Sequence, residues 1–331
     1  MKKVAVVILN WNGRKLLEQF LPSVVANSAL ATVYVADNAS DDDSISYLAA
    51  HFPEVKIIRN ASNWGFAKGY NESLKYVEEE IYALVNSDVE VTPNWLEPVV
   101  EMFESEPETA IVQPKIRDFR NKEYFEYAGA AGGFIDSFGY PFCRGRIFGT
   151  LEKDHGQYDD NIDIFWASGA CLFIRKNVFH DLKCFDADFF AHQEEIDLCW
   201  RAINKNHKVR YCAKSLVYHL GGATLSNQNA RKTYLNFRNS LAMLVKNLPQ
   251  HKLLFIILSR LVLDGLAGVR FLAKGQFTHI LAIVKAHFYF YGNFDRNYDK
   301  RSMFQKRNYY RVKNVAFDYF LRKKITFKEL F

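Results

Sequence analysis

The sequence predicts an α/β fold whose centre is a Rossmann-like, mostly parallel sheet flanked by helices. Short apolar runs rich in β-branched residues alternate with helical segments through the first hundred residues. The first run, residues 4–9, is continuously apolar, as expected for a strand that is buried on both faces. Strands that alternate with helices in this way pair in parallel through right-handed crossovers. With 331 residues, of which 49% are hydrophobic, the chain is long enough to bury a full core.

Apolar runs, helix caps and prolines indicate where the strands and helices should lie. Strands are expected at residues 4–9, 32–36, 55–58, 81–85 and 110–113, and helices at 15–27, 40–50, 67–80 and 93–104. Ser40 is expected to cap the second helix, and Pro93 to occupy the first turn of the fourth. Residues 118–165 are rich in Gly, Phe and Tyr without a clear period, so loops and small antiparallel strands are expected there. A strand (169–174), a helix (194–206) and two short strands (209–211 and 216–218) follow.

The pattern becomes helical from residue 232 onward. This predicts a boundary between a domain of residues 1–230 and a helical, basic extension of residues 231–331. Residues 253–273 are strongly apolar but carry Arg260 and Asp264, which are four apart and can pair. A membrane-spanning helix needs about 20 residues with few charges. We therefore expect an amphipathic helix that lies on a bilayer or packs on the protein, and a second one at residues 277–291.

Positive charge is concentrated in the tail. Residues 295–331 contain eleven Lys or Arg and four Asp or Glu, although the net charge of the whole chain is only +6. A basic tail with interleaved Phe and Tyr suits an anionic membrane surface or nucleic acid. Since no nucleic-acid-binding module is recognisable, no nucleic-acid partner is expected. Docking on the inner membrane surface, homodimerisation and a solvated basic helix are the open alternatives.

The cysteines indicate a reducing compartment. Five cysteines, an odd number, form no C-x-x-C pair, which argues against a disulfide framework or a structural zinc site. The apolar run after Met1 ends at Asn10 and is too short for a signal peptide. A cytoplasmic location is expected, with peripheral attachment to the inner face of the plasma membrane as an open alternative.

Asp88 follows the apolar strand of residues 81–85. Ligands of open α/β sheets bind outside the carboxyl ends of the strands, so Asp88 is expected at the functional site. Its carboxylate is a hard ligand suited to Mg²⁺ or Mn²⁺ that bridges phosphate oxygens. The chain has neither G-x-G-x-x-G after its first strand nor G-x-x-x-x-G-K-[ST], so phosphates must be held in another way. His219, followed by Gly221 and Gly222, could complete such a metal site.

Two further segments carry polar residues near the expected crevice. Asp37 follows the second strand, where a carboxylate can accept a hydrogen bond from a base or ribose. A role in shaping the turn is the alternative. At the third helix, Lys68 could meet a phosphate and Asn71 could donate an amide hydrogen bond. The alternative is an ordinary helix start with Lys68 in solvent.

An acidic cluster lies at the start of the helix expected at residues 194–206. Glu194 and Asp197 share one face of this helix, and Glu195 points elsewhere. Acidic side chains at a helix N-terminus are also favoured by the helix dipole, so simple capping is an alternative. Aromatic residues, including Phe189 and Phe190, surround the cluster. A carboxyl group in an aromatic environment can act as a general base.

Eight segments of the chain resemble, in the same order, those of family-2 glycosyltransferases, especially the bacterial rhamnosyltransferase-like branch. They are residues 6–12, 35–40, 63–66, 85–88, 166–170, 185–190, 194–201 and His219. The region of resemblance covers residues 4 to about 240. No single segment is specific, and the resemblance depends on their common order.

The resemblance implies a GT-A fold, a UDP- or dTDP-sugar donor, a divalent metal (Mn²⁺ or Mg²⁺) and inversion at the anomeric carbon. It also implies transfer to a hydroxyl of a glycan or lipid-linked acceptor in the synthesis of cell-surface polysaccharide. Carried over by position, Glu195 is the catalytic base, and Asp88 and His219 bind the metal. The other expected site residues are Asn10, Trp11, Asp37, Asn63, Lys68 and Asn71 for the nucleotide, and Trp166, Gly169, Glu194 and Asp197 for the acceptor or sugar.

The chain departs from the family pattern at two positions. Asn86 stands where the D-x-D segment of the family often has its first acid, and Glu195 stands where the base is usually Asp. The longer side chain shifts the carboxylate by about a bond length, and about 1 Å of misplacement can be costly. Two classes of function are therefore open: a metal-dependent glycosyltransferase, and a nucleotide-sugar-binding protein without transferase activity.

Overall fold

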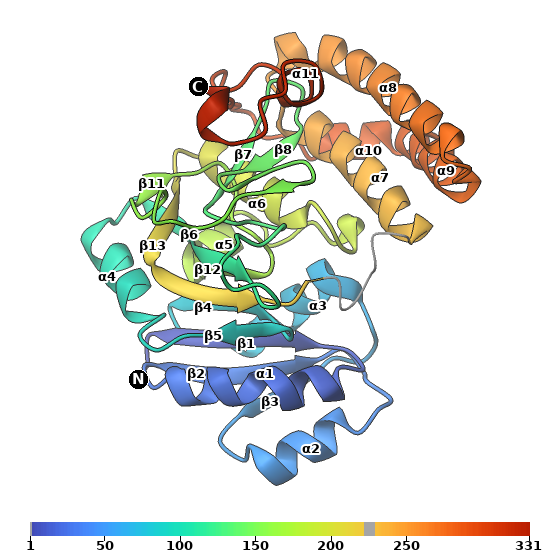
Figure 1. Ribbon diagram of the computed structural model, residues 1–331. Coiled ribbons are helices and arrows are strands. Elements are labelled where there is room, and N and C mark those ends of the chain that lie inside the picture. Colours follow the sequence, from blue (N-terminus) through green and yellow to red (C-terminus); the bar gives the residue numbers. More distant parts are fainter. Residues whose placement is uncertain (1, 222–228) are drawn as a thin grey trace.

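The computed structural model describes residues 2–221 and 229–331, and within them the main feature is a nine-stranded mixed sheet (Figure 1). The strand order is β11–β13–β6–β12–β4–β1–β2–β3, and β5 pairs with β13. These strands are β1 (Val4–Asn10), β2 (Ala31–Asp37), β3 (Lys56–Arg59), β4 (Ile81–Asn86), β5 (Val89–Val91), β6 (Thr109–Asp118), β11 (Ile162–Asp163), β12 (Cys171–Arg175) and β13 (Lys208–His219). A smaller antiparallel sheet contains β7 (Gly133–Ile135), β8 (Pro141–Cys143), β9 (Arg146–Ile147) and β10 (Thr150–Leu151).

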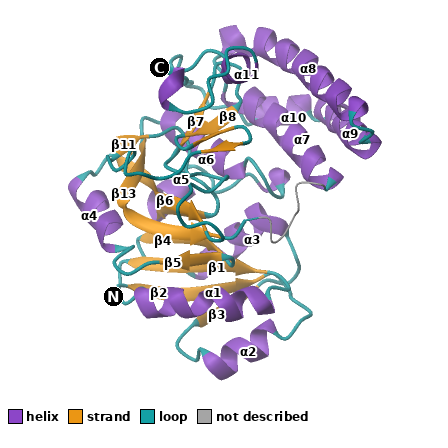
Figure 2. Ribbon diagram, viewed as in Figure 1, coloured by secondary structure: helices purple, strands orange, loops and turns teal. Residues whose placement is uncertain are grey.

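Helices cover the sheet and extend beyond it at the C-terminal end of the chain (Figure 2). They are α1 (Arg14–Asn27), α2 (Ser44–His51), α3 (Gly65–Ser73), α4 (Glu97–Ser105), α5 (Lys176–Asp181), α6 (Glu194–Asn204), α7 (Ala230–Asn247), α8 (Gln250–Ala273), α9 (Phe277–Gly292), α10 (Phe294–Asp299) and α11 (Val315–Phe320). Short 3-10 helices are η1 (Leu74–Tyr76), η2 (Ala187–Phe189) and η3 (Lys328–Leu330). The predicted α/β class with a helical C-terminal region is confirmed.

The parallel half of the sheet brings three strand ends to one edge. β1 lies between β2 and β4 and is parallel to both. In this register Asn10 is opposite Asp37, and Leu9 is opposite Asn86. β12 then runs antiparallel between β4 and β6. The mostly parallel arrangement of strands predicted from the first hundred residues is therefore present. Polar residues end these strands at the carboxyl edge of the sheet.

Two hydrophobic cores lie on the two faces of the sheet. One contains Leu17 of α1, Leu48 of α2 and Val99 of α4, and the other contains Tyr70 of α3 and Trp200 of α6. All five side chains are fully buried. Burying a Val or Leu side chain stabilises a fold by about 1.5–3 kcal/mol. The helices therefore hold the sheet edge in a fixed geometry.

Two local predictions about helix starts are wrong. α2 begins at Ser44 after Asp43, and Ser40 does not cap it, because its hydroxyl donates to Asp37 Oδ1 at 2.6 Å. α4 begins at Glu97 with Pro98 in its first turn, so Pro93 lies before the helix. Ser40 has the chemistry of a helix cap but is bonded to Asp37 instead, and Pro93 lies in a turn that precedes the helix.

The two short strands predicted at residues 209–211 and 216–218 are one strand. β13 runs from Lys208 to His219 with a shift of register between Cys212 and Leu216. Its length lets it pair with β6 along most of that strand and still reach β5 with its last residues. As a result, His219 lies opposite Val89, beside the turn that follows β4.

The C-terminal helices pack on the α/β body through α7, and α8 and α9 form an outer layer (Figure 1). Leu241 and Leu244 of α7 belong to the same core as Trp200. The predicted pair on α8 is present, with Arg260 Nε 3.8 Å from Asp264 Oδ1. Among the described residues, none of the helices combines the length and apolar character needed to span a membrane. The division of the chain at residue 230 stays a prediction.

Candidate active site

A buried polar cluster marks the ends of β1 and β2. Asn10 Nδ2 donates to Asp37 Oδ1 at 3.0 Å and to Ser40 Oγ at 3.2 Å. The backbone N–H of Ser40 donates to Asp37 Oδ2 at 2.9 Å. Asn10 and Asp37 are both buried. The Asp37 carboxylate is therefore held in one orientation by donors from its own strand end and from the neighbouring strand.

The other residues predicted to bind the nucleotide differ in their exposure and in their hydrogen bonds. Trp11 is 51% exposed, so its indole face is accessible. Asn63 Oδ1 accepts the N–H of Gly65 at 3.0 Å, which fixes the start of α3. Lys68 is exposed, with its ammonium 4.5 Å from the centre of the Trp64 ring. Asn71 is engaged with backbone, since it donates to Phe185 O at 2.8 Å and accepts from Phe185 N at 3.0 Å.

Asp88 lies in the turn between β4 and β5, next to His219 at the end of β13. Asp88 Oδ1 is 3.1 Å from His219 Nε2, and Glu126 Oε1 is 3.3 Å from His219 Nδ1. All three side chains are buried. Burial alone would lower the pKa of His219, but the carboxylates of Glu126 and Asp88 outweigh it and raise that pKa to about 10.

The donor set at Asp88 fits a divalent metal with few protein ligands. A ligating His usually has a carboxylate behind its second ring nitrogen, which is the position of Glu126. Carboxylate and imidazole are both ligands of Mn²⁺. Among the described residues, however, no group of three or more His, Cys, Asp or Glu gathers around one point to hold an ion. Protein ligands alone would therefore leave most coordination positions to other oxygens. Gly222, predicted beside His219, lies outside the described residues.

α6 begins at the predicted acidic cluster. Glu194 is buried and Glu195 is half-buried. Desolvation raises the pKa of Glu194 well above its usual range, and the nearby Glu195 carboxylate raises it further. Desolvation also raises the pKa of Glu195, to about 7, although backbone N–H groups at the helix start oppose the shift. A carboxyl group with a pKa near neutrality is suited to general base catalysis.

Glu195 faces the segment that leads into the start of β12. A side-chain carbon at Gly169 would lie 3.9 Å from the carboxyl carbon of Glu195 and 3.3 Å from the Phe66 ring. The backbone N–H of Asn86 donates to Ala170 O at 2.9 Å, so the turn that carries Asp88 is directly beside this segment. The predicted base and the predicted metal ligand are therefore brought to adjacent strand ends.

Several buried polar atoms at this edge have no hydrogen-bond partner within the described part of the chain. They are Asn10 Oδ1, His192 Nε2, Gln193 Oε1, Glu194 Oε2 and Glu195 Oε2. Buried polar groups in folded proteins are nearly always paired, and an unpaired one costs about 1–3 kcal/mol. Five such atoms at one edge of the sheet are typical of a site that a polar ligand completes.

The segment before α6, residues 188–193, is held in an unusual backbone conformation, and we refer to it as the base loop. Phe190, His192 and Gln193 have φ values of 64°, 71° and 73°. Residues with a side chain rarely adopt this left-handed region, and each instance costs about 1–3 kcal/mol. The base loop needs other contacts to keep this shape, and these decide where α6 begins and where Glu195 points.

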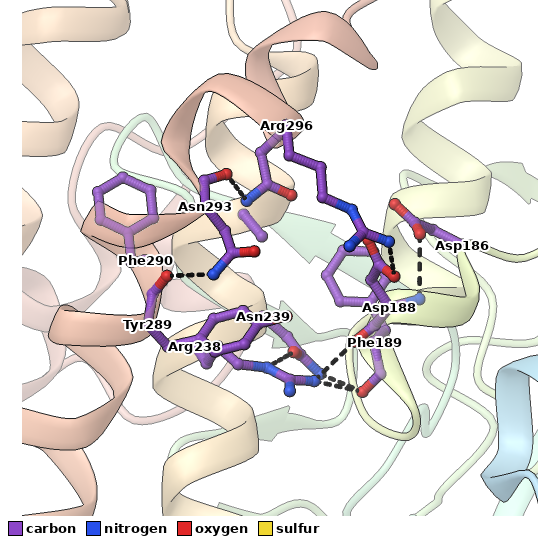
Figure 3. Close-up of a pocket in the computed structure, with 11 residues that line it drawn as sticks. Asp186, Asp188, Phe189, Arg238, Asn239, Tyr289, Phe290, Asn293 and Arg296 are labelled. Atoms are coloured by element: carbon purple, nitrogen blue, oxygen red, sulfur yellow. Dashed lines mark hydrogen bonds and ion pairs between the residues drawn. The ribbon is translucent and has the colours of Figure 1, made fainter.

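Arg238 and Asn239 of α7 supply those contacts (Figure 3). Arg238 Nη2 donates to the carbonyls of Asp188 at 2.9 Å and Phe189 at 2.8 Å. Asn239 Nδ2 lies within hydrogen-bond distance of three base-loop carbonyls, those of Phe189 (3.0 Å), Ala191 (2.9 Å) and His192 (2.7 Å). From the other side, the N–H of Phe66 at the start of α3 donates to Phe190 O at 2.8 Å. Neither Arg238 nor Asn239 is among the site residues predicted from the sequence.

Two of the predicted acceptor-side residues are engaged inside the protein. Asp197 is fully buried and accepts hydrogen bonds from Arg201, Lys246 and Asn247, each at 2.8 Å. Burial would raise the pKa of Asp197, but the two cations outweigh it and lower that pKa. Trp166 is also buried, and its Nε1–H donates to Phe134 O at 2.8 Å. Both side chains anchor the surroundings of α6.

With this geometry in view, comparison with known proteins gives the family. The model of the family described as glycosyl transferase family 2 matches residues 5–183. The chain belongs to this family, and it is a glycosyltransferase by membership. The resemblance seen in the sequence is confirmed.

Curated relatives support the same class at low identity. The chain is 23% identical over 208 residues to the N-acetylglucosaminyl-diphospho-decaprenol L-rhamnosyltransferase of Mycobacterium tuberculosis, covering 58% of this chain and 68% of that protein. It is 22% identical over 244 residues to the low-salt glycan biosynthesis hexosyltransferase Agl10 of Haloferax volcanii, covering 71% of this chain and 73% of that protein. By their names, the first relative is a rhamnosyltransferase and the second is a hexosyltransferase of glycan biosynthesis.

Solved structures confirm the GT-A fold. The structure of GalNAc-T7 with UDP, GalNAc and Mn²⁺ superposes with a TM-score of 0.60 at 15% identity, over 76% of this chain and 49% of that one. The chain thus spans about half the length of that protein. A mannosyltransferase of Pyrobaculum calidifontis in complex with GDP-Man and Mn²⁺ superposes with a TM-score of 0.53 at 14% identity, over 86% of each chain. At these identities the likeness concerns the fold.

Proposed function

We propose that this family-2 enzyme is an inverting glycosyltransferase that moves a sugar from a nucleotide-sugar donor to a hydroxyl of a glycan or lipid-linked acceptor. The product would be a cell-surface polysaccharide or its precursor. One observation carries the proposal: the carboxyl group of Glu195, with its raised pKa and an unpaired oxygen, lies beside Gly169 at the strand ends. The free state of all five cysteines supports a reducing, cytoplasmic location for the reaction.

The donor nucleotide would bind over the ends of β1 and β2. Asp37 is held by Asn10 and Ser40 so that its charge can accept hydrogen bonds from the imide N–H of a uracil or thymine base, or from a ribose hydroxyl. This chemistry favours a UDP- or dTDP-sugar. The exposed face of Trp11 could stack on the base, and the exposed Lys68 could approach a phosphate. Asn63 would contribute indirectly, because it fixes the start of α3. Asn71 is not proposed to contact the nucleotide, because it is bonded to the backbone of Phe185.

Asp88 and His219 would hold a divalent metal, Mn²⁺ or Mg²⁺, with Glu126 behind the imidazole. A metal bound there would supply charge that stabilises the departing diphosphate. Since His219 Nε2 and the Asp88 carboxylate now lie within 3.1 Å of each other, metal binding would displace any proton that they share. Metal affinity should therefore increase with pH.

Glu195 would be the base on the acceptor side. Its carboxylate would take the proton from the acceptor hydroxyl while that oxygen bonds to the anomeric carbon and the nucleoside diphosphate leaves from the opposite face. The geometry resembles that of an inverting glycosidase with a sugar hydroxyl in place of water. Gly169 leaves room beside the carboxylate, and Glu194 is the nearest second acid. Trp166 and Asp197 are left out of direct ligand contact because both are bonded internally.

The test is a panel of UDP-, dTDP- and GDP-sugars incubated with the protein, with and without Mn²⁺, while nucleoside diphosphate release is followed. We expect metal-stimulated release from one donor class. Glu195→Gln should bind that donor but lose release, and Glu104→Gln, a surface change on α4, should behave as wild type. Binding of a donor by the wild type without release or transfer to any acceptor would instead support the nucleotide-sugar-binding alternative. Absence of donor binding in every case would overturn the proposal.

A further inference from the structure

The outward surface of α8 and α9 is apolar, although both helices already bury their opposite side in the protein. We define the outer apolar face as the exposed residues Leu254, Phe255, Leu258, Val262, Leu266, Val269, Leu272, Phe277, Leu281, Val284, Phe288 and Tyr291. Each of these side chains is at least 43% exposed. We infer that this face docks the protein on an anionic lipid bilayer.

The spacing of these residues makes the face continuous. On α8 they recur at intervals of three and four, as in Leu258, Val262, Leu266 and Val269, and fall within an arc of about 120°. On α9 the same intervals connect Phe277, Leu281, Val284, Phe288 and Tyr291. α8 and α9 pack against each other, and on each helix the stripe is on the side opposite the buried residues. Contiguous exposed apolar patches larger than a few hundred Å² are rare on monomers and mark contact sites.

Specific contacts fix the buried side of both helices, and therefore also the direction in which the outer apolar face points. Arg260 donates to Ser240 Oγ of α7 at 2.8 Å and to Gly139 O at 3.2 Å. Asp264 Oδ2 is 3.1 Å from His287 Nε2, which joins α8 to α9. Arg260 and Asp264 are thus turned inward, away from the outer apolar face. Rotation of α8 to bury its part of the outer apolar face would expose the buried pair of Arg260 and Asp264.

Charge around the outer apolar face is of one sign. Between residues 250 and 294 the sequence contains one acidic residue, Asp264, and it is buried. Arg270, Lys274 and Lys285 are exposed and border the stripes. An apolar stripe with a cationic border is the pattern of helices that lie in the interface of an anionic membrane.

The basic tail lies along α8 and extends this border. Lys252 Nζ donates to Arg307 O at 3.4 Å near the start of α8, and Arg270 lies 5.6 Å from the Phe320 ring near its end. Residues 301–331 contain nine Lys or Arg and two Asp or Glu. They also expose large apolar side chains, of which Met303, at 89%, is the most exposed. The same combination of apolar and cationic groups therefore continues beside the helices.

This charge pattern selects a bilayer over a second copy of the chain. In a symmetric dimer through the outer apolar face, each cationic border would meet its own copy without an exposed acid on α8 or α9 to compensate it. Anionic headgroups supply that compensation, at about 1 kcal/mol for each Lys or Arg near the surface. Since the described helices are too short or too polar to span, they would lie in the plane of the membrane.

Vesicle sedimentation of the full chain tests this inference without donor, acceptor or metal, so its result is separate from that of the proposed reaction. Two vesicle types are used: pure phosphatidylcholine, and phosphatidylcholine with roughly a third phosphatidylglycerol. The disrupting variant combines Val262→Glu with Leu266→Glu, in the middle of the α8 stripe. The matched control is Leu30→Glu, an exposed leucine before β2. A second variant, Arg270→Glu with Lys274→Glu, changes the border alone.

We expect the wild type and Leu30→Glu to sediment with the anionic vesicles. Partition should fall about tenfold or more in the stripe variant, and about tenfold in the border variant for anionic vesicles only. Unchanged melting temperatures establish that each variant is folded. Failure of the wild type to bind anionic vesicles, or full binding by the stripe variant, would overturn the inference. The inference would also be overturned if sedimentation velocity shows that the wild type is a dimer and the stripe variant a monomer, while neither protein binds vesicles.

Discussion

The donor side of the candidate site, around Asp37, and its acceptor side, around Glu195, are built by different means. Asp37 is fixed by Asn10 and Ser40, which stand 27 positions before it and three after it. Glu195 is positioned by the base loop, whose carbonyls are held by Arg238 and Asn239 of α7, which lie 47 to 50 positions after the residues they bond. The first arrangement uses adjacent parallel strand ends, and the second uses a separate helix.

This difference has a consequence for how mutations should act. On the donor side a substitution removes one hydrogen bond to the nucleotide and leaves the strand ends in place. On the acceptor side a substitution in α7 should move the base without touching any ligand. Substitutions on the donor side should therefore change mainly donor affinity, and substitutions on the acceptor side mainly turnover.

Glu195→Gln should have the largest effect. The amide is isosteric but cannot accept the proton, so kcat should fall by about 10²–10⁴-fold, with the donor dissociation constant unchanged within about twofold. Steady-state release of nucleoside diphosphate and donor titration measure the two quantities. Glu195→Asp, which restores the usual family residue, should keep most of the activity. If Glu195→Gln retains wild-type kcat, another group is the base and the comparison between the two sides fails.

Asn239→Ala should come next. The base loop would lose the amide that reaches three of its carbonyls, and displacement of Glu195 by about 1 Å would lower kcat by about 10²-fold. Donor affinity should be unchanged, because Asp37 is held by Asn10 of β1 and by the backbone of Ser40. The control is Asn247→Ala, which removes an α7 amide bonded to Asp197 rather than to the base loop.

The separation of kcat from donor affinity distinguishes positioning from general destabilisation. A globally destabilised protein would lose donor binding and turnover together, in proportion to the folded fraction at the assay temperature. Equal losses of kcat in Asn239→Ala and Asn247→Ala would show that the base loop has no special role and that α7 acts only through packing.

The strand ends could be predicted from the sequence because the signals are local. The run of residues 81–85 is continuously apolar and is followed by Asp88, so both the strand and the position of its carboxylate follow from period and order. The same holds for Asp37 after β2. In each case the parallel pairing that brings these ends together needs only the alternation of strands and helices.

The remainder of the site could not be predicted because its determinants are tertiary. Glu126 lies in the segment without a period and is recognisable only when β13 brings His219 beside it. Ser40 has the chemistry of a helix cap, and its hydroxyl is instead bonded to Asp37. The only local indication of Arg238 and Asn239 is weak: they are polar residues near Leu235 and Leu241 on the buried side of an amphipathic helix.

Asp37→Asn should have a smaller effect, confined to donor binding. The substitution keeps the shape of the side chain and removes the charge that accepts hydrogen bonds from the nucleotide. A hydrogen bond to a charged group contributes about 1.5–3 kcal/mol, so donor affinity should fall by about tenfold or more, with kcat nearly unchanged. Calorimetric titration with the donor measures this. A loss of kcat equal to that of Asn239→Ala would remove the distinction between the two sides.

The smallest expected effect is the change of kcat with pH, which depends on the ionisation of Glu195 on the acceptor side. Burial raises the pKa of Glu195 to about 7, and a base must be ionised to accept a proton. The ionised fraction therefore rises with pH, and kcat at saturating donor and metal should increase by about fourfold between about pH 6.5 and about pH 8. The residual rate of Glu195→Gln should not follow this curve, because the amide does not titrate. A profile for the wild type that is flat over this range, with proton transfer still limiting, would show that Glu195 is ionised throughout. Burial of the Glu195 carboxyl group would then not be what tunes its pKa for catalysis. The difference between Glu195, which has an unpaired oxygen, and Asp37, which is hydrogen-bonded at both oxygens, would then not affect turnover.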